Sequence, residues 1–209
     1  MTAGGSIGEV GATLASVRGA TSDTLSPMPP TEPPVRLPAT LRHIVITGLM
    51  GSGKTTVGSR LAARLGWPWR DSDADIEAAS GLTVHQLGDR EGVDAMHARE
   101  AADLLDALAT QAPNVISAAA SVIDAPACRA AMIEPGVAVI WLHAEPALLA
   151  RRFRSADDHR PVFGEQPQVF LAEQAARREP LLADIGAHVI DVDHLTPDEE
   201  VARALEMLG

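Results

Sequence analysis

The sequence is poor in the residues that several common classes of site require. Cysteine occurs once in 209 residues, at Cys128, which excludes an intramolecular disulfide framework and the common zinc spacings. We expect a buried, unreactive thiol there, because no histidine or aspartate pattern marks it as a nucleophile. No apolar run approaches the roughly 18 residues of a membrane-spanning helix, and the N-terminus lacks the compact apolar segment of a secretory signal. We therefore expect a cytoplasmic protein with no membrane partner.

Positive charge is also scarce, and arginine carries almost all of it. The chain has 17 basic and 28 acidic residues, and its formal net charge is -11. A surface of that charge repels phosphate backbones, so we expect no nucleic acid partner. Lys54 is the only lysine, and every other basic residue is an arginine. We interpret this single lysine as a position where the chemistry requires an ammonium group.

The first forty residues differ in composition from the rest of the chain. Residues 1–40 are rich in Gly, Ala, Ser, Thr and Pro, and they include the run "SPMPPTEPPVRLP". Closely spaced prolines oppose both helix formation and sheet pairing. We expect residues 1–40 to be a disordered leader, or to precede the true start site. A transit peptide fits less well, because Glu9, Asp23 and Glu32 are acids where such peptides avoid them.

From residue 42 onward, short apolar runs alternate with stretches of helical periodicity. Such alternation is typical of βαβ units on a parallel sheet. The apolar runs predict strands at residues 43–48, 114–119, 137–143 and 187–192, and a shorter strand near residues 67–71. The helical periodicity predicts helices at residues 54–66, 93–109, 125–133, 145–154, 167–185 and 197–208. We therefore expect residues 41–209 to form one α/β domain with three αβα layers and about five parallel strands.

The stretch "GLMGSGKTT" satisfies the phosphate-loop pattern G-x-x-x-x-G-K-[ST] and lies between an apolar run and an amphipathic helix, as that pattern requires. In such a loop, backbone N–H groups and the helix N-terminus hold the phosphates, the lysine bridges the β- and γ-phosphates, and the threonine hydroxyl ligates Mg²⁺. The motif predicts binding of a nucleoside triphosphate and Mg²⁺ by Gly48, Gly51, Ser52, Gly53, Lys54, Thr55 and Thr56.

The loop alone is compatible with a small-molecule kinase, a GTPase-like switch or an ATPase motor domain. The chain length favours the kinase. A switch or motor needs a strand that ends in an aspartate to hold Mg²⁺, and the runs "NVISAA" and "VAVIWLH" end without one. We therefore expect a kinase of a small molecule.

An acidic segment, "RDSDADIEAASG", follows the second predicted strand. Asp75 and Glu77 fit a solvated first helical turn, which the helix dipole favours. Asp71 and Asp73 differ, because alternate residues that leave the carboxyl end of a strand share a face, and ligands bind at that end of a parallel sheet. We expect one of these two carboxylates to face Mg²⁺ and the other to face an acceptor hydroxyl.

At this point the sequence resembles a known family. The phosphate loop, the D-S-D-x-x-I-E pattern, the Ser-Gly turn and a helix that ends in Glu-Gly are similar to the first third of a shikimate kinase. The resemblance continues through "HRPVF" and "RREPLL" and covers about residues 42–208. It implies a P-loop kinase fold, a monomer, and ATP-dependent phosphorylation of a hydroxyl on a small polar metabolite. Shikimate is the best single candidate.

The resemblance also implies the catalytic residues. Lys54 would hold the phosphates, and Asp71 would help to position Mg²⁺ through water. Asp73 would bind the acceptor hydroxyls and orient or deprotonate the one that attacks. Arg160, in "HRP", would be a lid arginine that closes over the phosphates and neutralises charge in the transition state.

Two further binding roles follow from the same resemblance. Arg152, or its neighbour Arg151, would sandwich the adenine ring with Pro197. Arg178, in "RREPLL", would bind the carboxylate of the acceptor.

The acceptor side departs from the family pattern at three places. Three consecutive glycines of the family are replaced by Ala119, Ala120 and Ser121, and a positive φ at these positions would be strained. The second arginine for the acceptor carboxylate, in F-R-x-x-E, is replaced by His97, although Glu100 keeps its place. The tyrosine of the family's P-L-Y is Leu182.

These departures suggest a complete phosphate-donor half and a reshaped acceptor pocket, in which Asp73, His97, Ala119, Ala120, Ser121 and Arg178 would meet the substrate. Alternatives to shikimate phosphorylation therefore stay open at this point. The acceptor could be another polyol, cyclitol or sugar acid. The "LGWPW" segment is shared with gluconate kinases, which makes gluconate one such acid. The chain could also be a regulatory protein that binds nucleotide without turnover.

Overall fold

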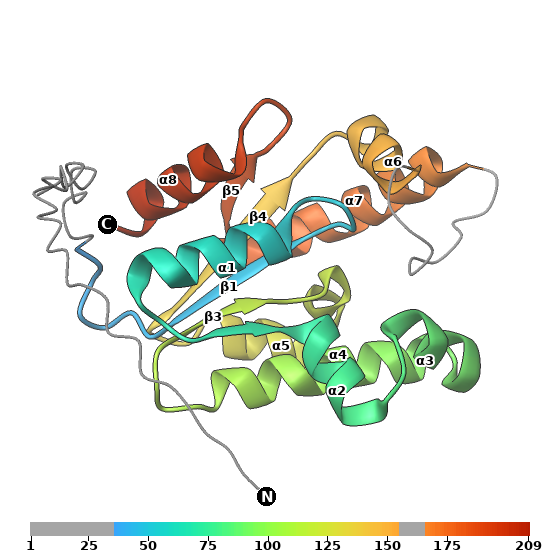
Figure 1. The fold of residues 1–209 in the computed structure, drawn as a ribbon, viewed down its shortest axis with the longest axis horizontal. Coiled ribbons are helices and arrows are strands. Elements are labelled where there is room, and N and C mark those ends of the chain that lie inside the picture. Colours follow the sequence, from blue (N-terminus) through green and yellow to red (C-terminus); the bar gives the residue numbers. More distant parts are fainter. Residues whose placement is uncertain (1–35, 155–165) are drawn as a thin grey trace, which may run out of the picture. The chain divides into compact units, whose positions relative to one another are not determined.

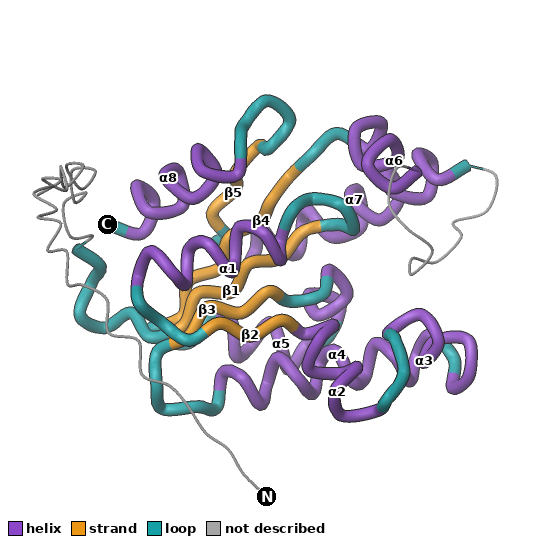
Figure 2. The backbone as a smooth tube through the Cα atoms, in the orientation of Figure 1, coloured by secondary structure: helices purple, strands orange, loops and turns teal. Residues whose placement is uncertain are grey.

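The computed structural model describes residues 36–154 and 166–209, with the side chains of residues 153 and 154 outside the description. Five parallel strands form one sheet in the order β2-β3-β1-β4-β5. Helices α1 and α8 pack together on one face of this sheet, and α4 and α5 pack together on the other (Figure 1). Figure 2 shows the strands enclosed between these two helical layers. The predicted three-layer αβα fold with a five-stranded parallel sheet is confirmed.

The strands lie close to their predicted positions. They are β1 (His43–Gly48), β2 (Trp69–Asp71), β3 (Asn114–Ser117), β4 (Val137–His143) and β5 (His188–Asp191). Strand β1 is buried at all six positions and pairs with both β3 and β4. A central parallel strand is covered on both faces, which explains why its sequence is a continuous apolar run.

The helices follow the predicted periodicity, with two additions. They are α1 (Lys54–Leu65), α2 (Ser72–Ser80), α3 (Val84–Glu91), α4 (Val93–Leu108), α5 (Pro126–Met132), α6 (Pro146–Arg154), α7 (Pro167–Asp184) and α8 (Pro197–Leu208). Periodicity did not predict α2 or α3, although the acidic turn and the resemblance pointed to helix in that region. Both are short, and each begins with a side-chain cap, from Asp71 and Thr83 respectively.

The segment after β3 differs from the prediction. Strand β3 ends at Ser117, two residues early, and a 3₁₀ helix η1 follows at Ala120–Asp124. Ala119 has φ -59° and ψ 150°, an ordinary extended conformation. The strain that we expected from replacing glycine is therefore absent at this residue.

The core is centred on the sheet. Its fully buried side chains include Ile44, Ile46, Ile116, Ile140 and Leu142. Cys128 is also fully buried, and burial raises the pKa of its thiol. No helix in the described ranges is long and apolar enough to cross a membrane.

Candidate active site

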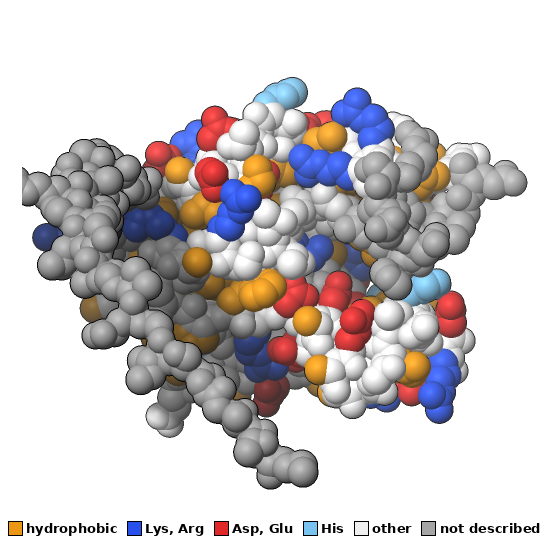
Figure 3. Space-filling view, viewed as in Figure 1, with side chains coloured by type: hydrophobic (Ala, Val, Ile, Leu, Met, Phe, Trp, Pro, Cys, Tyr) orange, Lys and Arg blue, Asp and Glu red, His pale blue; other side chains and the backbone are white. Residues whose placement is uncertain are grey.

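A cleft of about 920 Å³ opens at the carboxyl ends of the parallel strands, where ligands bind in open α/β sheets. Its walls come from the loop before α1, from α2 to α4, from the start of η1, and from α6 and α7. Figure 3 shows a hollow beside acidic side chains that gather over the start of α2. The cleft is lined by these residues of the predicted site: Gly51, Gly53, Lys54, Thr55, Thr56, Asp71, Asp73, His97, Ala119, Ala120, Ser121, Arg152 and Arg178.

The conformation of the loop requires its glycines. Gly51 and Gly53 have φ values of 82° and 102°, which side-chain-bearing residues rarely adopt. A Cβ on Gly48 would lie 2.4 Å from the Ser52 Oγ and 2.8 Å from the backbone oxygen of Leu142. The loop therefore holds its shape because three positions carry no side chain.

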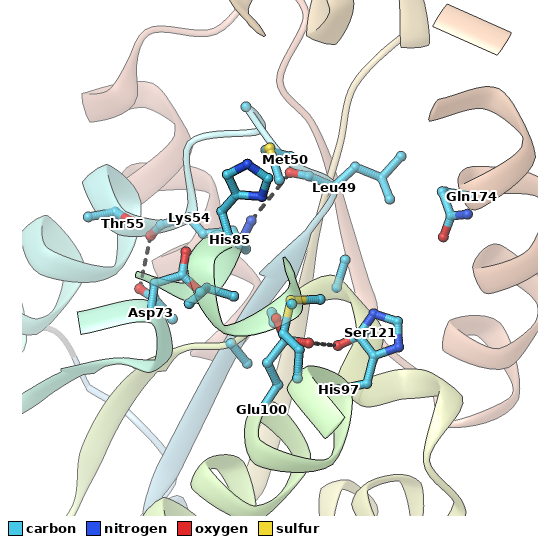
Figure 4. Close-up of a pocket in the computed structure, with 18 of the residues that line it drawn as sticks. Leu49, Met50, Lys54, Thr55, Asp73, His85, His97, Glu100, Ser121 and Gln174 are labelled. Carbon is cyan, nitrogen blue, oxygen red and sulfur yellow. Dashed lines mark hydrogen bonds between the residues drawn. The ribbon is translucent and has the colours of Figure 1, made fainter. Parts of the chain in front are cut away.

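Two polar groups of the loop fit an anionic ligand. The Lys54 ammonium donates to the backbone oxygen of Leu49 at 3.3 Å, which folds this side chain back over the loop (Figure 4). The buried Ser52 hydroxyl has no hydrogen-bond partner among the described residues. The ammonium group, the hydroxyl and the glycine-rich backbone of this loop are hydrogen-bond donors suited to a triphosphate.

Thr55 and Asp71 meet beside the loop. The Thr55 Oγ1 donates to the Asp71 Oδ2 at 2.8 Å, and Asp71 also caps α2 by accepting from the backbone N–H of Ala74 at 3.4 Å. Within residues 36–154 and 166–209, no group of three or more His, Cys, Asp or Glu side chains is arranged to hold a metal ion. A Mg²⁺ ion at Thr55 and Asp71 would therefore complete its coordination with phosphate oxygens and water, as Mg²⁺ commonly does.

Asp73 reaches the cleft from a different element than predicted. We expected Asp71 and Asp73 to share a face of an extended strand, but Asp73 lies in the first turn of α2. In Figure 4, Lys54, Thr55 and Asp73 are seen on the left, and His97, Glu100 and Ser121 are seen below and to the right of them. Asp71 and Asp73 therefore both line the cleft because of the start of α2, and not because they alternate along a strand.

The second group contains a buried carboxyl. Glu100, on α4, is 5% exposed and accepts a hydrogen bond from the Ser121 hydroxyl of η1. Burial raises the pKa of Glu100 to about 7, and the nearby Asp73 carboxylate adds to the rise. The Ser121 hydrogen bond, Arg178 and Lys54 oppose this shift of the pKa. A pKa of about 7 leaves the carboxyl of Glu100 partly protonated near neutral pH.

Arg178 is buried and already has an internal partner. Its Nε and Nη2 donate to the Asp124 Oδ2 at 3.2 and 2.8 Å, and its side chain is 6% exposed. Arg177 donates from its Nη2 to the same oxygen at 2.6 Å. Neither Asp124 nor Arg177 was predicted from the sequence to belong to the site. The only signal was the adjacent arginine pair in "RREPLL", because Asp124 lies more than 50 positions earlier in the chain.

His97 lies near these arginines, and it lines the cleft as well as a smaller surface hollow next to it. Burial lowers the pKa of His97, and the positive charges of Arg178 and Arg177 lower it further, whereas Asp124 raises it. The imidazole is consequently neutral at physiological pH, so it supplies no fixed positive charge where the family pattern has an arginine.

The residues predicted to bind the adenine ring lie on α6 and α8. Arg152 donates to the backbone oxygen of Gly51 at 3.2 Å, which connects α6 to the phosphate loop. Pro197 is the first residue of α8 and does not line the cleft. The helix does approach the loop, since the Glu200 Oε2 lies 3.7 Å from where a Cβ on Gly53 would be. Arg160 lies outside the described residues, as does the rest of its "HRP" motif.

Comparison with known proteins gives the same family as the motifs. The family model described as "Shikimate kinase" matches residues 50–209. A shikimate kinase of Caulobacter vibrioides is 36% identical over 173 residues, covering 80% of this chain and 84% of that protein. A shikimate kinase of Symbiobacterium thermophilum is 39% identical and covers 79% of this chain and 95% of that protein.

Solved structures separate this family from a neighbouring one. The shikimate kinase of Acinetobacter baumannii in complex with shikimate has a TM-score of 0.73 and 27% identity, over 80% of this chain and 93% of that chain. A gluconokinase from Sinorhizobium meliloti has a TM-score of 0.50 and 25% identity, over 80% and 91% of the two chains. Together with the family model and the relatives, these similarities show that the chain belongs to the shikimate kinase family.

Proposed function

We propose that the protein transfers the γ-phosphoryl group of ATP to a hydroxyl of shikimate. The observation that carries this proposal is a single cleft that joins a phosphate loop to Asp73, Glu100 and Arg178. The two halves of such a cleft would bring donor and acceptor together, and in phosphoryl transfer most of the catalysis is positioning and charge neutralisation. Membership of the shikimate kinase family and the similarity to a shikimate-bound structure support this choice of acceptor.

On the donor side, we assign Lys54 to the β- and γ-phosphates and the backbone N–H groups of residues 51–56 to the same anion. Thr55 and Asp71 would hold Mg²⁺, Thr55 directly and Asp71 through water. When bound, this ion neutralises charge that develops on the phosphate oxygens. The existing 2.8 Å contact between the two side chains supports this assignment, because it brings a hydroxyl and a carboxylate to one point beside the loop.

On the acceptor side, we assign Asp73 to the attacking hydroxyl, which it would orient or deprotonate. Arg178 would bind the carboxylate, and Arg160 would close over the phosphates. His97, Ala119, Ala120 and Ser121 would form the walls around the acceptor ring. All except Arg160, which is outside the described residues, line the cleft.

A neutral polyol or cyclitol is the second candidate acceptor. It is favoured by one observation, namely that Arg178 is already paired with Asp124 and has a neutral histidine beside it. Gluconate is a weaker candidate, because the gluconokinase structure is less similar than the shikimate kinase structure.

An assay of ADP formation tests the proposal. The purified protein would be supplied with ATP and Mg²⁺, and the rate would be compared without acceptor and with shikimate, gluconate or a neutral cyclitol. We expect shikimate to give the largest stimulation, with a monophosphorylated product detected by mass spectrometry. Intact ATP binding without stimulation by any acceptor would instead indicate a nucleotide-binding regulatory protein.

The proposal includes a monomeric enzyme in the cytoplasm, where ATP is available. Light scattering coupled to size exclusion would test the first point, with about 21.9 kDa expected for one chain. Localisation of a tagged full-length chain would test the second.

A further inference from the structure

Two adjacent arginines of α7 converge on one carboxylate oxygen. The Asp124 Oδ2 accepts from the Arg177 Nη2 at 2.6 Å and from the Arg178 Nη2 at 2.8 Å. Consecutive helical residues do not normally face each other. The two guanidinium groups nevertheless meet, because Asp124 projects from the end of η1 and holds both.

Arg177 faces the ligand cleft as well as Asp124. It lines the large cleft, as Arg178 does, and it also borders the smaller hollow beside His97. Its side chain is 55% exposed, whereas that of Arg178 is 6% exposed. A second contact from its Nη2 reaches the Gln174 Oε1 at 3.3 Å. Arg177 is therefore anchored along one edge of its guanidinium while it remains accessible from the cleft.

Each guanidinium carries five N–H donors, and Asp124 uses only some of them. Arg178 contacts Asp124 through Nε and Nη2, and Arg177 through Nη2. The Nη1 groups of both arginines have no hydrogen bond to another described residue. Two guanidinium groups and one carboxylate also give the cluster of Arg177, Arg178 and Asp124 a net positive charge. The pair thus retains both the donors and the charge that a ligand carboxylate needs.

We propose that Arg177 is the second arginine for the carboxylate of the acceptor, in place of the one that the family pattern has at the position of His97. This inference rests on the proposed function, since it assumes an acceptor with a carboxylate. In this arrangement the two arginines come from one helix, and Asp124 positions both. The pocket would then remain selective for an anionic acceptor, although His97 stands where the family pattern has an arginine.

Kinetics of Arg177→Gln with two acceptors test this inference. The acceptors are shikimate and its methyl ester, which keeps the ring hydroxyls and lacks the negative charge. We expect kcat/KM for shikimate to fall about tenfold or more, as for loss of a hydrogen bond to a charged group. The KM for ATP and kcat/KM for the ester should stay within about twofold. Adding His97→Arg to this variant should recover most of the loss for shikimate.

Arg203→Gln is the matched control, because Arg203 is an exposed helical arginine with one ion pair, to Glu206, and lies outside the cleft. It should leave both acceptors unaffected. An equal loss for both acceptors in Arg177→Gln, no loss for shikimate, or no recovery with His97→Arg would overturn the inference. If the unmodified protein did not phosphorylate shikimate at all, the proposed function itself would be refuted, which is a distinguishable result.

Discussion

The Ser121 hydroxyl donates a hydrogen bond to Glu100 in a buried part of the cleft, where the family pattern has a glycine instead of a serine. This contact connects a substituted position to a retained one. It lowers the pKa of Glu100, although burial outweighs it and keeps the pKa at about 7. The pair therefore influences how the stability of the protein depends on pH.

Glu100→Gln should flatten the dependence of stability on pH. The pKa of Glu100 is raised in the folded state, so the native protein binds more protons than the unfolded chain between about pH 4.5 and 7. Stability therefore falls as pH rises through this window, by roughly 3 kcal/mol for this carboxyl alone. Denaturant unfolding at pH 5 and pH 7.5 should show a smaller difference in the variant. An identical difference in both proteins would contradict the raised pKa.

Ser121→Ala should raise the pH at which the carboxyl of Glu100 ionises. The variant removes the hydrogen bond that favours the ionised carboxylate, so the pKa of Glu100 should rise further. The fall of stability with pH would still begin near the pKa of the unfolded chain, but it would extend to a higher pH than in the unmodified protein. Titration of Glu100 by NMR, with ¹³C-labelled glutamate, measures this directly. A lower pKa in Ser121→Ala would be incompatible with the contact.

Thr55→Val should reduce catalysis through the metal site. The valine keeps the shape of the side chain but loses the hydroxyl that contacts Asp71 at 2.8 Å. We expect kcat to fall about 10- to 100-fold, with a higher Mg²⁺ concentration needed for half-maximal rate. Thr55→Ser retains a hydroxyl and is the matched control, with activity close to that of the unmodified protein. Equal activities of the valine and serine variants would exclude a metal ligand at this position.

Gly48→Ala should destabilise the fold. The added Cβ would meet the Ser52 Oγ at 2.4 Å and the backbone oxygen of Leu142 at 2.8 Å, and the backbone cannot easily move away. Overpacking of this kind costs roughly 1–3 kcal/mol. Gly88→Ala is the comparison. Gly88 lies within α3, and its Cβ would meet only the flexible side chain of Met96, at 3.2 Å. In thermal unfolding, the melting temperature of Gly48→Ala should be lower than that of Gly88→Ala. The reverse order would contradict the loop geometry.

The strand, turn and helix of the phosphate loop were predicted from the sequence because their determinants are local. A strand, a glycine-rich turn and a helix follow one another in "HIVITGLMGSGKTTVGSRL", so the fold of that stretch could be read from adjacent residues. The sheet was predicted for the same reason, since each buried strand is a short apolar run.

The acceptor half depends on contacts between distant residues. Nothing near Asp124 in the sequence indicates that it binds Arg177 and Arg178, because η1 and α7 are brought together only by the complete fold. Asp73 was likewise expected to follow the end of a strand, but it lies in the first turn of the capped helix α2. Tertiary packing therefore determines what the acceptor meets.

The most direct test of the account is ADP formation with shikimate by the unmodified protein and by Asp73→Asn. We predict shikimate-dependent ADP formation by the unmodified protein. Mass spectrometry should show one phosphorylated shikimate for each ADP formed. In Asp73→Asn we predict a rate at least about 100-fold lower with unchanged ATP binding, because the attacking hydroxyl loses its carboxylate. Unchanged shikimate phosphorylation in Asp73→Asn, or no shikimate phosphorylation by the unmodified protein, would contradict the account.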